Sequence, residues 1–119
     1  MNYDNPDLKK VMSWAGTGRG PEGIVRTFVD VARCWEREAF VIETHFGSGE
    51  NVAAFGRFTY RSVVLKKSVT SPFAIGAKVK DGRCSYMQFM EDTFATGVSF
   101  RSGGRWTFKS DPDGKEVAI

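Results

Sequence analysis

The sequence predicts an α+β fold in which one amphipathic helix near the N-terminus packs against a curved antiparallel sheet. Apolar residues recur at spacings of three and four over residues 21–36, which is the period of a helix with one apolar face. After Glu38 the pattern changes to short alternating runs separated by turn residues, which is typical of antiparallel strands. A chain of 119 residues suits one compact domain, which we place at residues 1–119.

The predicted helix begins directly after a glycine-rich stretch. Pro21 suits the first turn of a helix, and Glu22 lies near the positive end of the helix dipole. Its apolar face consists of Ile24, Phe28, Val31 and Trp35. We therefore expect this helix to cover one face of the sheet.

Turn residues divide the rest of the chain into strands. The predicted strands span residues 39–46, 51–62, 68–80, 84–91 and 98–109. The segments 47–50 and 80–83 are hairpin signals, and the second contains an Asp-Gly pair that tolerates positive φ. A short helical turn is predicted from Asp92 to Thr96, with Asp92 as its N-cap and Gly97 at its end.

Composition and charge exclude several classes of protein. Hydrophobic residues make up 41% and charged residues 26% of the chain, the balance of a globular protein and not of a disordered one. No apolar run exceeds about four residues, whereas a membrane span needs roughly twenty. The first residues lack the pattern of a secretory or organellar signal, so the cytoplasm is the expected location.

The two cysteines give no sign of a metal or redox site. Cys34 and Cys84 lie far apart in the sequence and outside any CxxC spacing. We expect both to be buried free thiols, and we expect no cofactor and no metal.

The segment 18–23 matches the GxGxxG pattern of dinucleotide-binding proteins. However, Pro21 removes a backbone N–H where a phosphate would bind, and no alternation of strands and helices follows. We therefore interpret the segment as a glycine-rich entry to the helix.

A basic and aromatic strand invites comparison with nucleic-acid-binding proteins. Arg57 and Arg61 alternate with Phe58 and Tyr60, and the formal net charge is +3. Alternating charge on the solvent face of an antiparallel strand gives the same pattern, so nucleic acid is a disfavoured partner.

His45 is the only histidine, so any imidazole chemistry has to use this residue. The chain has no HExxH motif and no recognisable nucleophile elbow. A hydrogen-bonded strand residue is the preferred interpretation of His45, and a role in a pocket is the second.

The segment Tyr86–Asp92 ends a strand with two adjacent carboxyl groups, which point to opposite faces of an extended chain. If Asp92 faces an apolar cavity, Met90, Gln88 and Tyr86 line the same side. Burial would then raise the pKa of Asp92 toward the range useful for a general base. A helix N-cap is the other interpretation of Asp92, and the sequence leaves both open.

Four segments, taken in order, carry a resemblance to a known family: Trp14–Gly20, Ser71–Ala74, Val79–Arg83 and Phe89–Thr93. Over residues 7–108 the chain resembles the SnoaL-like branch of the nuclear transport factor 2-like superfamily. The resemblance implies a strongly bent antiparallel sheet, a cone or half-barrel, that encloses an apolar cavity and commonly forms a homodimer through the sheet.

Family members usually carry one or two further helices before the segment that corresponds to residues 7–14. The chain is thus N-terminally short relative to the family. Either the reading frame is short at its start, or this is a natural minimal variant in which a partner subunit covers the face that those helices would occupy.

The resemblance also implies a function. Asp92 is similar to the acid–base residue of the polyketide cyclases, so it would take a proton next to a carbonyl of a small hydrophobic, oxygenated molecule. The residues expected to bind that molecule are Trp14, Phe28, His45, Arg57, Tyr86, Gln88 and Met90. The alternative is a non-catalytic dimerisation or ligand-carrier module of the same fold, in which Asp92 only caps a helix.

The face of the second strand that lines the cavity stays open at this stage. The apolar alternation points Phe58 and Tyr60 inward, whereas the family resemblance points Arg57 and Thr59 into the cavity.

Overall fold

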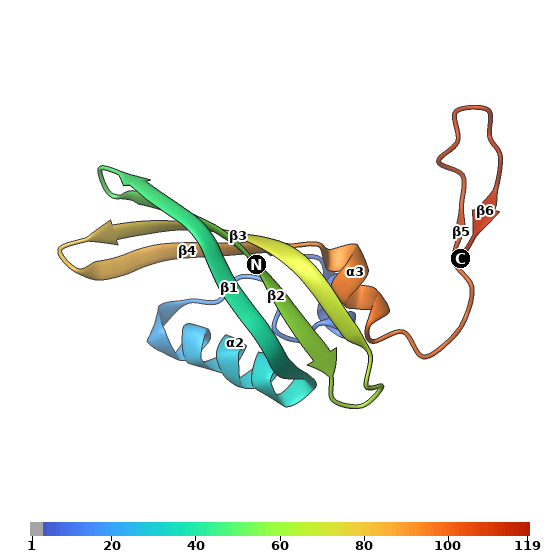
Figure 1. Cartoon of the computed structure of the whole chain (residues 1–119), viewed down its shortest axis with the longest axis horizontal. Coiled ribbons are helices and arrows are strands. Elements are labelled where there is room, and N and C mark those ends of the chain that lie inside the picture. The colour runs from blue at the N-terminus through green and yellow to red at the C-terminus, as the bar shows by residue number, and fades with distance from the viewer. Residues whose placement is uncertain (1–3) are drawn as a thin grey trace.

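The computed structural model describes residues 4–119, so residues 1–3 of the predicted domain lie outside it. Its main body is a four-stranded antiparallel sheet in the order β1-β2-β3-β4 (Figure 1). The strands are β1 (Trp35–Ser48), β2 (Asn51–Ser62), β3 (Ser68–Lys80) and β4 (Arg83–Glu91). The helices are α1 (Pro6–Val11), α2 (Gly20–Cys34) and α3 (Thr93–Val98). The predicted α+β class is confirmed.

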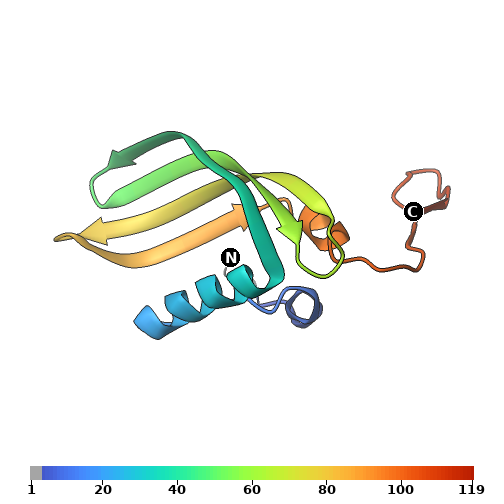
Figure 2. The ribbon, with the colours of Figure 1, turned by 60° about the horizontal axis from the view of Figure 1, so that its bottom comes forward.

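Helix α2 lies against one face of the curved sheet, as Figure 2 shows. It begins with Gly20 and Pro21 and carries Glu22 in its first turn. The prediction placed Trp35 inside the helix, but Trp35 is the first residue of β1. No helix among residues 4–119 is long and apolar enough to cross a membrane.

Helix α1 was not predicted from the sequence. The side chain of Asn5 accepts hydrogen bonds from the backbone N–H groups of Asp7 and Leu8, at 2.9 and 3.2 Å. Pro6 occupies the first helical position, where its missing N–H costs nothing. The Asn-Pro-Asp triplet was thus a local signal for a helix start.

Both predicted hairpins are present. Gly49 at the β1–β2 turn has a φ of 60°. At the β3–β4 turn, Asp81 and Gly82 have φ values of 51° and 75°, as a two-residue hairpin turn requires. The Asp-Gly prediction is confirmed.

Three single-residue register shifts interrupt the pairing of the strands. In β1, Glu38 and Glu43 each lie between paired residues without a partner of their own in β2. In β4, Ser85 lies in the same way between Cys84 and Tyr86. Such bulges increase the local twist and bend the strand, which agrees with the curvature of the sheet in Figure 2.

We call the face of the sheet toward α2 the inner face and the opposite one the outer face. Phe58 and Phe73 on the inner face are only 2% and 3% exposed. Gly56 pairs with Phe73, and a Cβ atom at Gly56 would lie 2.6 Å from Phe73 Cζ and would also collide with the Val41 carbonyl oxygen. A glycine is therefore required at this point of the core.

The predicted strand over residues 98–109 is wrong. Helix α3 continues to Val98, and only β5 (Thr107–Phe108) and β6 (Val117–Ala118) pair beyond it. Figure 1 shows this C-terminal hairpin projecting away from the main body. Residues 99–106 form no strand, and the main sheet ends at β4.

The expectation of two buried thiols is wrong for one of them. Cys34, at the end of α2, is partly buried, but Cys84 is exposed. Cys84 lies beside the β3–β4 turn, where the hairpin extends past the region that α2 covers (Figure 1).

Candidate functional site

A cavity of about 560 Å³ lies between α2 and the inner face of the sheet. This volume falls within the range of pockets that hold small molecules. Helix α2 contributes Ile24, Thr27, Phe28 and Val31, and the segment before it contributes Trp14, Thr17 and several glycines. The sheet contributes Trp35, Phe40, Phe58, Tyr60, Ile75, Cys84, Ser85, Tyr86, Met87, Phe89 and Glu91. The lining is thus mainly aromatic and aliphatic.

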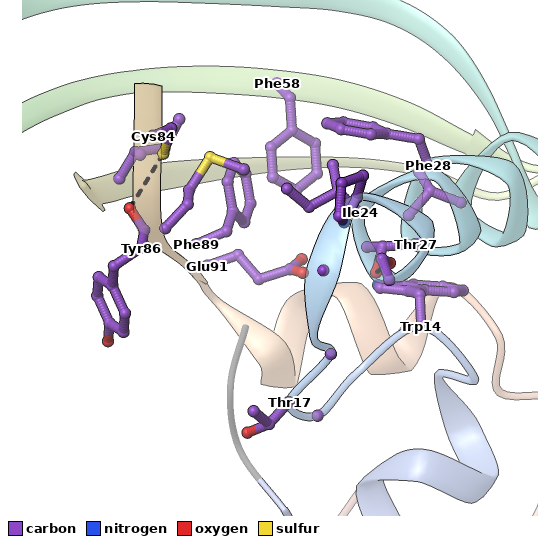
Figure 3. A pocket seen from close by; sticks show the side chains of 18 of the residues that line it. Trp14, Thr17, Ile24, Thr27, Phe28, Phe58, Cys84, Tyr86, Phe89 and Glu91 are labelled. Atoms are coloured by element: carbon purple, nitrogen blue, oxygen red, sulfur yellow. Dashed lines mark hydrogen bonds between the residues drawn. The ribbon is translucent and has the colours of Figure 1, made fainter. Parts of the chain in front are cut away.

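Glu91 is the only acidic or basic side chain among the described residues that line the cavity. In Figure 3 it reaches from the end of β4 toward α2, with its carboxylate on the side of Thr27. Phe89, two residues earlier on β4, shares its face of the sheet, and Glu91 pairs with the buried Phe73 of β3. The carboxylate therefore lies among aromatic rings.

Burial raises the pKa of Glu91 above its ordinary value. A hydrogen bond with the side chain of Thr96 acts in the opposite direction, and the charge of neighbouring Asp92 raises the pKa further. A buried carboxyl group with a raised pKa holds its proton more tightly than an exposed one does. Glu91 is therefore the group among the described lining residues that a general acid–base role would use.

Tyr60 on β2 is the second polar group of interest in the cavity. Its ring lies 4.4 Å from that of Phe58 and 5.5 Å from that of Trp35, measured between centroids. Burial raises the pKa of Tyr60; the charge of Arg37 opposes this and that of Glu91 adds to it. The phenol thus stays protonated and is available as a hydrogen-bond donor.

The structure brings three of the predicted site residues to the cavity: Trp14, Phe28 and Tyr86. The ring of Trp14 packs edge to face against Trp35, with 5.9 Å between centroids. Tyr86 lies at the rim, and in Figure 3 its ring points away from the other lining side chains. Its hydroxyl group lies 3.1 Å from Oε1 of Gln88.

Four predicted ligand-binding residues are not in the lining. Gln88 and Met90 lie on the outer face, where they pair with Gly76 and Ala74. Arg57 is also on the outer face, and its Nε donates a 2.5 Å hydrogen bond to Glu43. His45 pairs with Ala54 farther along β1 and is exposed. Phe58 and Tyr60 face inward, which answers the question left open for the second strand.

Asp92 is placed at the start of α3 and not in the cavity. Its Oδ1 accepts a hydrogen bond of 3.0 Å from the backbone N–H of Ala95, so the predicted N-cap is confirmed. The side chain is exposed, and the strand ends one residue earlier, at Glu91. Asp92 does not face the cavity because of the bulge at Ser85. The bulge exchanges the two faces of β4 over the rest of the strand.

Glu91 and Tyr60 were not predicted as site residues. For Tyr60 the sequence left open whether its side chain faces inward, and it was assigned no role. Glu91 was considered together with Asp92, and the choice between them depended on a register that the turn alone does not determine. No group of metal-binding side chains gathers among residues 4–119.

Comparison of the fold with solved structures places it in a known class. A nuclear transport factor 2-like protein from Burkholderia pseudomallei matches with a TM-score of 0.71 at 19% identity, over 82% of this chain and 73% of that chain. TerC, co-crystallised with polyporic acid, matches with a TM-score of 0.66 at 19% identity, over 80% of this chain and 72% of that one. The chain thus has the fold of nuclear transport factor 2-like proteins.

The chain is also similar in sequence to curated proteins. The chain is 44% identical over 118 residues to patulin synthesis protein F of Aspergillus clavatus, which covers 96% of this chain. It spans about three fifths of the length of the curated relatives it matches. No family model matches the sequence.

Proposed function

We propose that the chain binds a small, largely apolar, oxygenated molecule in the cavity and catalyses an isomerase- or cyclase-type proton transfer on it, with Glu91 as the acid–base group. The observation that carries this proposal is the single carboxylate in an otherwise apolar and aromatic lining. The fold and the relative named for patulin synthesis support small-molecule chemistry in general.

In the proposed reaction, the Glu91 carboxylate removes a proton from a carbon next to a ligand carbonyl. The bonding electrons move to the carbonyl oxygen and form an enolate, which the Tyr60 hydroxyl stabilises by donating a hydrogen bond. The protonated Glu91 then returns the proton to another carbon of the same conjugated system. The surrounding rings provide an apolar environment, in which both interactions are stronger than in water.

Deuterium exchange tests this chemistry without knowledge of the natural substrate. The probe is 2-tetralone in D₂O, whose exchange next to the carbonyl is followed by proton NMR. The wild-type chain should accelerate exchange over buffer, and Glu91→Gln should lose about 100-fold of this acceleration. An unchanged rate in Glu91→Gln would contradict the assignment.

Asp92→Asn is the matched control, since it removes the neighbouring charge and keeps a good N-cap. It also tests Asp92 as the alternative acid–base residue. On our proposal its exchange rate stays within about twofold of wild type, whereas a loss in Asp92→Asn alone would transfer the role to Asp92.

The second candidate function is a non-catalytic ligand carrier or dimerisation module. Exposed apolar side chains on the outer face support a homodimer, in particular Phe46 at 62% and Phe55 at 43% exposure. A carrier would bind 2-tetralone, measured by quenching of tryptophan fluorescence, without accelerating exchange. Sedimentation of the chain over a range of concentrations tests the dimer. The cytoplasm stays the predicted location.

A further inference from the structure

The charged side chains that line the cavity determine which molecules it can accept. Among the described lining residues, the one formal charge at neutral pH belongs to Glu91, and no lysine, arginine or histidine lines the cavity to balance a bound anion. Arg37 acts electrostatically on Tyr60 but does not itself line the cavity. A carboxylate or phosphate entering the cavity would meet a like charge and no partner.

Two hydroxyl groups lie on opposite sides of the cavity. Thr27 Oγ1 on α2 already donates a 3.0 Å hydrogen bond to the Gly23 carbonyl. The Tyr60 hydroxyl is contributed by β2 on the sheet side. The cavity therefore offers hydroxyl groups, which suit carbonyl, hydroxyl or ether oxygens of a neutral molecule.

The floor of the cavity favours flat rings. Phe58 and Phe89 line it and lie next to the buried Phe73, with Phe73 and Phe89 stacked 5.2 Å apart at an interplanar angle of 20°. Phe58 and Phe73 are stacked in the same way, at 26°. Rings stacked on one another present their edges to the cavity, and an unsaturated ring of a ligand can pack edge to face against them.

We propose that the cavity selects uncharged, planar ring compounds with neutral oxygen groups, and that Glu91 excludes carboxylates and phosphates of the same shape. This inference rests on the proposed function, because it concerns the ligand of the same cavity. Such selection also restricts the reaction that supplies the substrate. That reaction must release a ring compound without an ionised carboxylate or phosphate on the part that enters the cavity.

Two probes of the same shape test the selection: 2-naphthamide, which is neutral, and 2-naphthoate, which is anionic. Their Kd values are measured at pH 8 by quenching of tryptophan fluorescence, since Trp14 and Trp35 line the cavity. Wild type should bind the amide at least about tenfold more tightly than the carboxylate. In Glu91→Gln the carboxylate should bind about tenfold more tightly than in wild type, and the amide within about threefold of wild type.

Glu43→Gln is the matched control, because it removes the same charge from the outer face of the same sheet. It should leave both Kd values within about twofold of wild type, as a screened charge outside the cavity contributes little. If Glu91→Gln fails to fold, Glu91→Met keeps the length of the side chain and requires no hydrogen-bond partner.

Two results would overturn the inference in distinguishable ways. If naphthoate binds wild type as tightly as naphthamide, or if loss of the Glu91 charge leaves its Kd unchanged, the selection against anions is wrong and the proposed binding function stands. If neither probe quenches the tryptophans, the proposed binding function is wrong as well.

Discussion

The two faces of the four-stranded sheet differ in chemistry although the same strands form both. On the inner face aromatic rings contact one another, as Phe73 does with Phe40 at 4.7 Å and with Phe89 at 5.2 Å. On the outer face polar side chains pair with each other, as Thr59 does with Thr70 at 2.8 Å. The Glu91 carboxylate on the inner face thus lies among rings that carry no opposite charge, and the proposed proton transfer uses that face.

A single extra residue decides which carboxylate lies on the inner face. Without the bulge at Ser85, a two-residue turn at Asp81 and Gly82 would pair Phe73 with Met90, so that Met90 would face inward. With the bulge, Phe73 pairs with Glu91. A shift of one residue moves every later side chain of a strand to the other face, so the active-site assignment depends on this bulge.

The largest expected effect is a loss of stability when a side chain is added at Gly56 on the inner face. Gly56→Ala should reduce the free energy of unfolding by about 3 kcal/mol, because its Cβ would collide with the Phe73 ring and the Val41 carbonyl oxygen. Chemical denaturation measures the change. Gly76→Ala is the comparison from the outer face, where a Cβ would meet nothing within 4 Å, and it should stay within about 0.5 kcal/mol of wild type. Equal stability of the two variants would contradict the described packing.

Local sequence signals predicted much of this fold correctly. The Asp81–Gly82 turn needs positive φ, and the alternation through Phe58 and Phe73 marks a buried face, so β2, β3 and their hairpin connections could be predicted. In β4 both faces carry apolar or amphipathic residues, Met87 and Phe89 on one and Tyr86 and Met90 on the other, so either face could be buried. Its register follows from pairing with β3 and from the bulge, which are tertiary features that periodicity does not contain.

The second prediction tests that register directly. Phe89→Ala should lower the free energy of unfolding by about 2 kcal/mol, since it removes a half-buried ring from the inner face. Met90→Ala, one residue later on the outer face, should cost less than about 1 kcal/mol because Met90 is exposed. Denaturation at low protein concentration measures both. The opposite order would mean that β4 lacks the bulge and that Asp92, not Glu91, faces the cavity.

The third prediction uses the raised pKa of Glu91. Burial places its pKa in the folded protein above its ordinary value of 4.5, so the folded state holds the proton more tightly than the unfolded chain does. This stabilisation is complete below the unfolded pKa and is lost as the pH rises through the folded pKa. The quantity to measure is the free energy of unfolding of wild type minus that of Glu91→Gln. This difference should become smaller as the pH rises from about 4 to about 8. A difference that rises with pH would show that Glu91 is stabilised as a carboxylate and is not a buried acid.

The smallest expected effect belongs to the outer face. Arg57→Ala breaks the 2.5 Å ion pair with Glu43, in which both side chains are about half exposed. Because water screens such pairs, the free energy of unfolding should fall by less than about 1 kcal/mol. The affinity for 2-naphthamide should not change, since Arg57 lies on the face opposite the cavity. A loss of affinity in Arg57→Ala without a loss of stability would instead place a binding surface on the outer face, and the functional contrast between the two faces would have to be abandoned.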